Sequence, residues 1–233
     1  ASMDFTPNLE EASGFFSCCM RFDSEQLYMT EDKIENAARD TLNDHTREHN
    51  LESTVETGLN KCIVNADIIL ENYADQIGYR VDHSGEEKPG HHGCTHFGEK
   101  KVVIYNNKNQ QTNRFACAHE LFHLRHHREY YEKYQSEEYF EAPDFFEKNA
   151  NLYARTLLTP RTKFTAAADN FIDHYTAGKK LDCGTLHEVV RDLATVFGVA
   201  GKMAALRFKQ LYPSYGQLVE RTLLEYPNIF PRN

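Results

Sequence analysis

The segment Arg114 to His127 reads RFACAHELFHLRHH. It predicts a helix with one buried apolar face and one face rich in histidine. An apolar stripe of Cys117, Leu121 and Leu124 lies at helical spacing along it. The residues just before it, Thr112-Asn113, are good helix caps. A helix of this kind is stable only inside a packed domain. We therefore expect other elements of the chain to cover its apolar face.

Two histidines of this segment, His119 and His123, have the spacing of the HExxH motif. They project from one helix face and can hold one Zn²⁺, while Glu120 can act as general base on a zinc-activated water. The alternative is a pair of core histidines bonded to backbone groups. The segment His45 to His49, HTREH, fits the inverted motif HxxEH, but its neighbours are polar, which favours a solvated helix end.

A catalytic zinc needs a third protein ligand and one open position. In the metzincin pattern this ligand would fall at Glu129, where a histidine is expected, and His126 replaces the turn glycine. The other candidate is Glu147, in a helix expected from about Asp144 to Leu158, with the small Ala150 on the same face. Glu147 could instead be an exposed glutamate that favours the helix dipole.

Hydrophobic periodicity predicts further elements on both sides of the motif. Gly78 is expected to end the helix that precedes the strands. The strands are short and suggest a small sheet. The expected helices are Thr30 to Asn50, Leu59 to Ile77, Leu186 to Phe197 and Ala200 to Leu211, and the expected strands are Tyr79 to Val81, Cys94 to Phe97 and Lys101 to Tyr105.

Composition excludes several classes of function. The formal net charge is −9, with 26 Lys and Arg against 35 Asp and Glu, so we expect no direct nucleic-acid binding. The six cysteines show no CxxC spacing, which indicates reduced thiols. No segment has the pattern of a signal peptide or of a membrane span, so we expect a cytoplasmic protein that does not contact membranes.

Four ordered motifs together resemble the ImmA/IrrE family of intracellular zinc metallopeptidases. They are VVIYN, NRFACAHELFHL, EKNANLYARTLLTP and FGVAGKMAALRFKQL, and the resemblance covers roughly Leu59 to Leu211. It implies that His119 and His123 are zinc ligands, that Glu120 is the base and that Glu147 is the third ligand.

The resemblance also implies a fold and a function. We expect an α+β protein, with a mostly helical, minimal zincin-like domain and a small three-stranded sheet, antiparallel or mixed. The expected division is an arm and helical extension at 1–58, the metallopeptidase domain at 59–212 and a tail at 213–233. Members of the family cleave or inactivate a DNA-bound repressor, frequently in mobile elements, which implies a zinc-dependent endopeptidase whose partner is a transcriptional regulator.

Other residues are candidates for an oxyanion donor or a substrate contact, namely Tyr153, His92, His96 and Tyr105. The strand Val102 to Tyr105 could be an edge onto which an extended substrate adds, or an ordinary packed strand. His92, Cys94 and His96 would share a strand face and suggest a second metal, but the surrounding glycines indicate bends and argue against it.

The remaining histidines of the segment, His126 and His127, are expected in the last turn of the helix, where cations complement the helix dipole. A second class of function also stays open. The chain could be a zinc-stabilised binding module that sequesters a transcriptional regulator without cutting it, with the acidic, Tyr-rich segment 128–146 as its contact surface.

Overall fold

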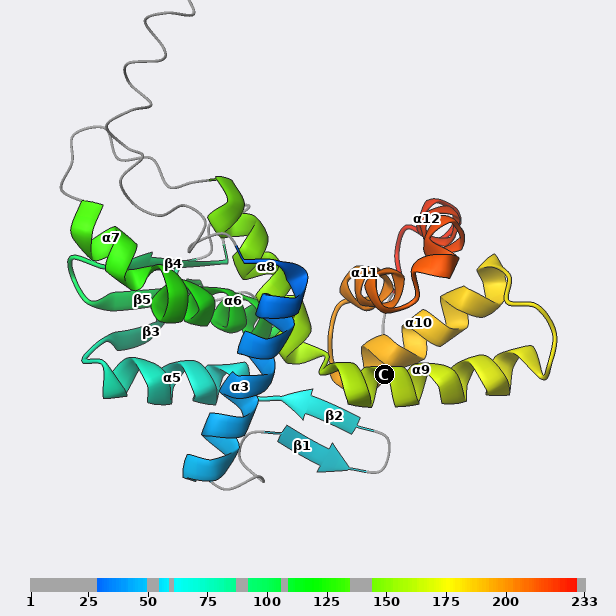
Figure 1. The fold of residues 1–233 in the computed structure, drawn as a ribbon, viewed down its shortest axis with the longest axis horizontal. Helices are drawn as coiled ribbons and strands as arrows, with labels where there is room; N and C mark the ends of the chain where they lie inside the picture. The colour runs from blue at the N-terminus through cyan, green and yellow to red at the C-terminus, as the bar shows by residue number, and fades with distance from the viewer. Residues whose placement is uncertain are drawn as a thin grey trace, which may run out of the picture.

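A computed structural model describes residues 29–49, 55–58, 61–86, 92–105, 109–134 and 144–229. This part of the chain is mostly helical and contains a small three-stranded mixed sheet, which confirms the α+β fold (Figure 1). The helices are α3 (Glu31–His49), α5 (Ala66–Gln76), α6 (Gln110–Phe122), α7 (Arg128–Tyr134), α8 (Asp144–Leu158), α9 (Arg161–Thr176), α10 (Cys183–Phe197), α11 (Gly201–Leu211) and α12 (Gly216–Glu225), with a π-helical segment at His123–His127 and a 3-10 turn at Pro213–Tyr215.

The three-stranded sheet has the order β3-β5-β4, formed by β3 (Arg80–Gly85), β4 (Gly93–His96) and β5 (Lys101–Tyr105). Strand β5 pairs in parallel with β3 and antiparallel with β4. Of the two alternatives for Val102 to Tyr105, the edge is therefore wrong and the packed strand is confirmed. These four residues are all buried, as in a strand with neighbours on both sides, and the edge beside α6 is β4.

A second pairing joins β1 (Val55–Gly58) to β2 (Lys61–Val64) in an antiparallel hairpin. The expected helix from Leu59 to Ile77 is wrong in its first part, because residues 61–64 form β2 and the helix begins at Ala66. Burial alternates along β2, with Cys62 and Val64 inward, which is the period of a strand. The helix ends as expected, since Gly78 follows it with φ of +74°.

The helices that position the HExxH segment surround α6. Helix α6 contacts α5 and the sheet on one side and α8 on another, and α3 crosses α8 (Figure 1). Buried Ala118 and Leu121 of α6 belong to the same hydrophobic core as Ala150 and Ala154 of α8. Small residues on α8 permit the close approach of the two helices that the third-ligand hypothesis requires.

Helices α9 to α12 form a second group, on the right of Figure 1, that packs on the end of α8 and on β2. A fully buried side chain, Arg207 of α11, connects the groups. Its guanidinium donates to both carboxylate oxygens of Glu35 on α3, at 2.8 and 2.9 Å, and to the carbonyl oxygen of Thr159. The division of the chain at residues 58 and 212 stays a prediction.

The structure bears on two expectations, reduced cysteines and the absence of a membrane span. The four described cysteines, Cys62, Cys94, Cys117 and Cys183, are free thiols, as predicted. Cys18 and Cys19 lie outside the described residues. None of the described helices has the length and apolar character that crossing a bilayer requires.

Candidate metal centre

The HExxH segment is carried by α6 and by the π-helical segment that continues it. Helix α6 begins earlier than expected, because Asn109 caps it by accepting a hydrogen bond from the Gln111 N–H at 2.9 Å. The chain then passes without a break into the π-helical segment His123–His127 and into α7. Wider turns of this type are rare and occur often at functional sites.

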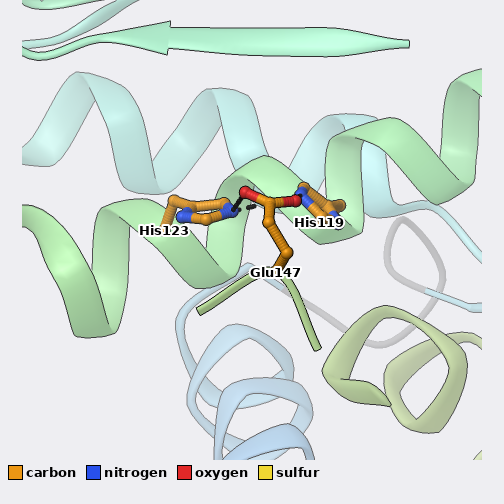
Figure 2. Close-up of side chains that lie close together, drawn as sticks. All are labelled: His119, His123 and Glu147. Carbon is orange, nitrogen blue, oxygen red and sulfur yellow. Dashed lines mark hydrogen bonds and ion pairs between the residues drawn. The ribbon is translucent and has the colours of Figure 1, made fainter. Parts of the chain in front are cut away.

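Three side chains converge where α6 faces α8 (Figure 2). The Nε2 atoms of His119 and His123 lie 3.1 Å apart. The Glu147 carboxylate lies between the two rings, with Oε2 3.2 Å from His119 Nε2 and Oε1 3.4 Å from His123 Nε2. Ligands placed ~2.05 Å from a tetrahedral zinc lie about 3.3 Å from one another. The cluster therefore has the spacing and the His₂Glu donor set of a catalytic zinc site.

The cluster is partly open to solvent. The side chains of His119 and His123 are 14% and 6% exposed, whereas that of Glu147 is 63% exposed. Hydrogen bonds from His119 and His123 hold the pKa of the Glu147 carboxyl well below its usual range. Burial lowers the pKa of His119, but the hydrogen bond to Glu147 and the charges of Glu120 and Glu147 outweigh it, so the pKa is raised. The site thus attracts positive charge on its open side.

The other ring nitrogen of each histidine has a partner of its own. His119 Nδ1 lies 3.2 Å from Asn151 Oδ1 on α8, and His123 Nδ1 lies 3.0 Å from His127 Nδ1. Such contacts fix the orientation and tautomer of metal-binding histidines. Here they leave both Nε2 atoms directed at the space that Glu147 faces.

The expectation that His126 and His127 act as helix-end cations is wrong. The helical run continues through α7, so these residues do not lie at a helix terminus. His127 is 1% exposed and stacks on Phe146, with ring centroids 3.6 Å apart. Burial lowers the pKa of His126 to about 4 and that of His127 further, so both are neutral at pH 7. A neutral His127 can accept the hydrogen bond from His123.

Glu120 lies beside the cluster and is held by the edge strand β4. It is 5% exposed, and its Oε2 accepts a hydrogen bond from Thr95 Oγ1 at 2.7 Å. Gly93 allows this approach, because a Cβ there would lie 2.9 Å from Glu120 Cγ. A cavity of about 240 Å³ is lined by Glu120 together with His119 and Glu147. The base candidate and the ligand candidates therefore face one space.

The weaker candidates lie in different places. His92 is exposed and lines the same cavity. His96 is exposed at the end of β4, and Tyr105 is 8% exposed on the central strand. Tyr153 is fully buried, and its hydroxyl lies 2.7 Å from Thr41 Oγ1 of α3. The Tyr153 hydroxyl thus has a partner in the core, and Tyr153 does not line the cavity beside the cluster.

The two alternative metal sites gain no support among the described residues. Among these residues, only His119, His123 and Glu147 bring three potential metal ligands close together. The side chains of Glu48 and His49 lie outside the described part of the chain, so the inverted motif is not tested as a whole. Its first histidine, His45, is 6% exposed, which corrects the expected solvated helix end at that residue.

Sequence reasoning assigned no role to several residues of the site. Asn151, Thr95 and Gly93 touch a ligand candidate or the base candidate, and Tyr131 of α7 packs near His123, with ring centroids 6.3 Å apart. Burial, with the charges of Glu147 and Glu120, raises the pKa of Tyr131. Asn151 could have been found, since it shares a helix face with Glu147 at i and i+4. Thr95 could not, because only the tertiary fold brings β4 to α6.

Comparison with known proteins decides the family. A family model described as the IrrE N-terminal-like domain, Peptidase_M78, matches residues 74–209, which include the whole cluster. The chain belongs to this family. The predicted kinship with the ImmA/IrrE proteins is thereby confirmed. No curated protein sequence matches the chain.

Solved structures also resemble the IrrE N-terminal-like chain. One is a Mycobacterium tuberculosis transcriptional regulator, 18% identical in sequence, with a TM-score of 0.49. The match covers 81% of this chain and 49% of that one, so this chain spans about half the length of the regulator.

Proposed function

We propose that this chain is a zinc-dependent endopeptidase that cleaves a regulatory protein in the cytoplasm. The observation that carries the proposal is the spacing of 3.1 to 3.4 Å among the donor atoms of His119, His123 and Glu147, with Glu120 beside them. Membership of a peptidase family supports it. His₂Glu is a ligand set of catalytic zinc in peptidases.

In this proposal the side chains divide two tasks. His119, His123 and Glu147 would hold Zn²⁺, which when bound would supply Lewis acidity and lower the pKa of a water ligand to ~7. Glu120 takes a proton from the attacking water and returns it to the leaving amine. The Thr95 hydroxyl holds Oε2 of Glu120, so the other carboxylate oxygen can receive the proton.

The charge that develops on the scissile carbonyl oxygen needs a hydrogen-bond donor. Tyr131 and His92 are our candidates. Tyr131 packs near His123, with ring centroids 6.3 Å apart, and is protonated at neutral pH like any tyrosine, while His92 is exposed and lines the cavity. Tyr131 lies on α7, which follows the π-helical segment, and His92 directly precedes β4.

The substrate we propose is an extended segment of a transcriptional regulator, as the ImmA/IrrE resemblance implies. Among the described strands, β4 has a neighbour on one side only, and its Gly93 and Thr95 touch Glu120. A peptide that pairs with this edge through backbone hydrogen bonds would pass beside the base. A binding module that sequesters its partner has no need for a buried glutamate held in this way, so we favour the peptidase.

The test compares Glu120→Gln with the wild type. Zinc content is measured by elemental analysis, and cleavage of a mixed-sequence peptide library by mass spectrometry. We expect Glu120→Gln to keep its zinc and to lose cleavage by ~10²–10⁴-fold, because only the proton acceptor is removed. Glu129→Gln, an exposed glutamate at the position of the rejected third ligand, serves as control and should cleave normally. Equal turnover by Glu120→Gln and wild type would contradict the proposal.

A further inference from the structure

A second cavity adjoins the metal centre. It encloses about 580 Å³ between α6, α8 and the first turn of α11, and we call it the Arg155 cavity. His92, Phe115 and Asn151 line both this cavity and the one that contains His119 and Glu147. The two cavities are therefore adjacent, and the proposal below takes a peptide across the metal centre to extend from one into the other.

One face of α8 links the two spaces. Glu147, Asn151 and Arg155 follow one another at intervals of four residues, so their side chains lie in a row. Glu147 contacts both histidines, Asn151 contacts His119, and Arg155 lines the second cavity. Eight residues of α-helix span ~12 Å, which is about the length of three to four residues of extended peptide. Arg155 is thus within reach of a residue near the scissile bond.

The Arg155 cavity is positively charged. Arg155 and Lys202 line it, and none of its described lining residues is acidic. Neither cation lies within ion-pair distance of a described carboxylate, although the charge of Glu31 on α3 acts on Arg155, and Arg155 Nε is buried without a hydrogen-bond partner among the described residues. The first turn of α11 adds the positive end of a helix dipole. The positive charge of the cavity is opposite in sign to the net charge of the whole chain, which is −9.

The walls of the cavity suit the stem of an acidic side chain. Phe115, Met203 and Leu206 provide apolar contacts, while the cations lie among them. We propose that the Arg155 cavity binds a carboxylate of the peptide substrate, from a Glu or Asp side chain or from a free C-terminus near the scissile bond. The proposal rests on the proposed peptidase function, but it concerns binding and can be tested without turnover.

The test measures binding to the zinc-loaded Glu120→Gln form of the 233-residue chain by fluorescence anisotropy. The probes are fluorescein-labelled, alanine-rich nonapeptides with an amidated C-terminus, in which a single Glu is moved from position to position. A matched series carries Gln, and a third carries Gln with a free C-terminus. We expect Glu to improve binding about tenfold at one or two positions, as a charge-assisted hydrogen bond would. Improvement in the third series alone would assign the site to a C-terminal carboxylate.

Substitutions then locate the effect. In the Glu120→Gln background, Arg155→Gln or Lys202→Gln should remove most of the preference for the carboxylate. Lys180→Glu, which changes another exposed lysine outside the cavity, should leave it unchanged. Circular dichroism and zinc content show whether Arg155→Gln is folded, and the exposed Lys202 serves if it is not.

The proposal is overturned if Glu and Gln peptides bind equally at every position, if the preference persists when both cations are replaced, or if no peptide binds at ~1 mM. The peptidase proposal is judged separately, by cleavage with the wild type. Cleavage without a carboxylate preference would retain the enzyme and reject the cavity assignment.

Discussion

Gly93 of β4 lies so close to Glu120 that no side chain fits between them. A Cβ at this position would lie 2.9 Å from Glu120 Cγ and 3.0 Å from Oε1. The contact is with the polar end of the general-base candidate, not with a metal ligand. Proton transfer depends on where this carboxylate lies within hydrogen-bond reach of water, and displacements of about 1 Å can cost ~10²-fold in rate.

Gly93→Ala should therefore lower turnover while zinc binding persists. We expect a fall in kcat of ~10- to 100-fold, because the added methyl group displaces the Glu120 carboxylate. Peptide cleavage and zinc content are measured on the same samples. Gly184→Ala is the matched control, because a Cβ there meets no atom closer than 3.7 Å. An unchanged kcat in Gly93→Ala would show that the close approach has no catalytic role.

At the scale of elements, the π-helical segment His123–His127 supplies a residue that supports a ligand candidate from behind. His127 lies inside it, contacts His123 Nδ1 at 3.0 Å and stacks on Phe146, the residue before Glu147. One ring thus contacts a ligand candidate and the first turn of the helix that carries another. We infer that His127 positions His123 and that its stacking on Phe146 stabilises the packing of α8.

Two substitutions separate these contributions. His127→Phe keeps an aromatic ring on Phe146 but removes the Nδ1 contact, whereas His127→Ala removes both. We expect zinc affinity to fall ~10- to 100-fold in each variant. The free energy of unfolding of the metal-free protein should fall by about 2 to 4 kcal/mol in His127→Ala and much less in His127→Phe. Competition with a zinc chelator and urea denaturation measure the two quantities. If His127→Phe binds zinc as tightly as wild type, His127 is only a packing residue.

The same elements show how far sequence reasoning reached. Strand β5 and helix α8 have the predicted bounds, Lys101 to Tyr105 and Asp144 to Leu158, because a β-branched run and a closing Thr-Pro mark them locally. The hairpin strand β2 was missed, since the four residues KCIV fit a helix as well as a strand. Its strand assignment depends on β1, whose pairing is not visible in a local pattern.

In the candidate site, too, the residues with a local sequence signal were predicted and the contacts made by the tertiary fold were not. His119, Glu120, His123 and Glu147 were named from spacing and resemblance, and the structure brings their side chains together. Contacts across the fold were not predicted. Thr95 reaches Glu120 from a strand 25 positions earlier, and β5 is central only because β3 returns beside it. His127 was misjudged because the helix does not end there.

For the whole molecule, the joint between α3, α8 and α11 depends on a buried ion pair. Arg207 is 0% exposed, and both oxygens of Glu35 accept hydrogen bonds from it. Removal of one partner from such a pair leaves an uncompensated buried charge. Because α8 carries Glu147 and ends at this joint, the metal centre and the α9 to α12 group are mechanically connected.

Glu35→Gln should destabilise the fold by about 3 kcal/mol, because the Arg207 guanidinium then stays buried without a counterion. Glu220→Gln is the control. It removes the exposed partner of Lys209 and should cost less than about 1 kcal/mol. Urea denaturation of the two variants and the wild type gives the comparison. Equal losses in the two variants would show that the Arg207 pair does not hold the helices together.

The central claim is that His119, His123 and Glu147 jointly hold one zinc ion, and diffraction data collected at the zinc absorption edge from zinc-loaded crystals test it most directly. We predict a single anomalous peak about 2.0–2.2 Å from His119 Nε2, His123 Nε2 and a carboxylate oxygen of Glu147, with one coordination position left for solvent. Zinc-loaded crystals that show no peak there, or a peak that Glu147 does not reach, would contradict the account.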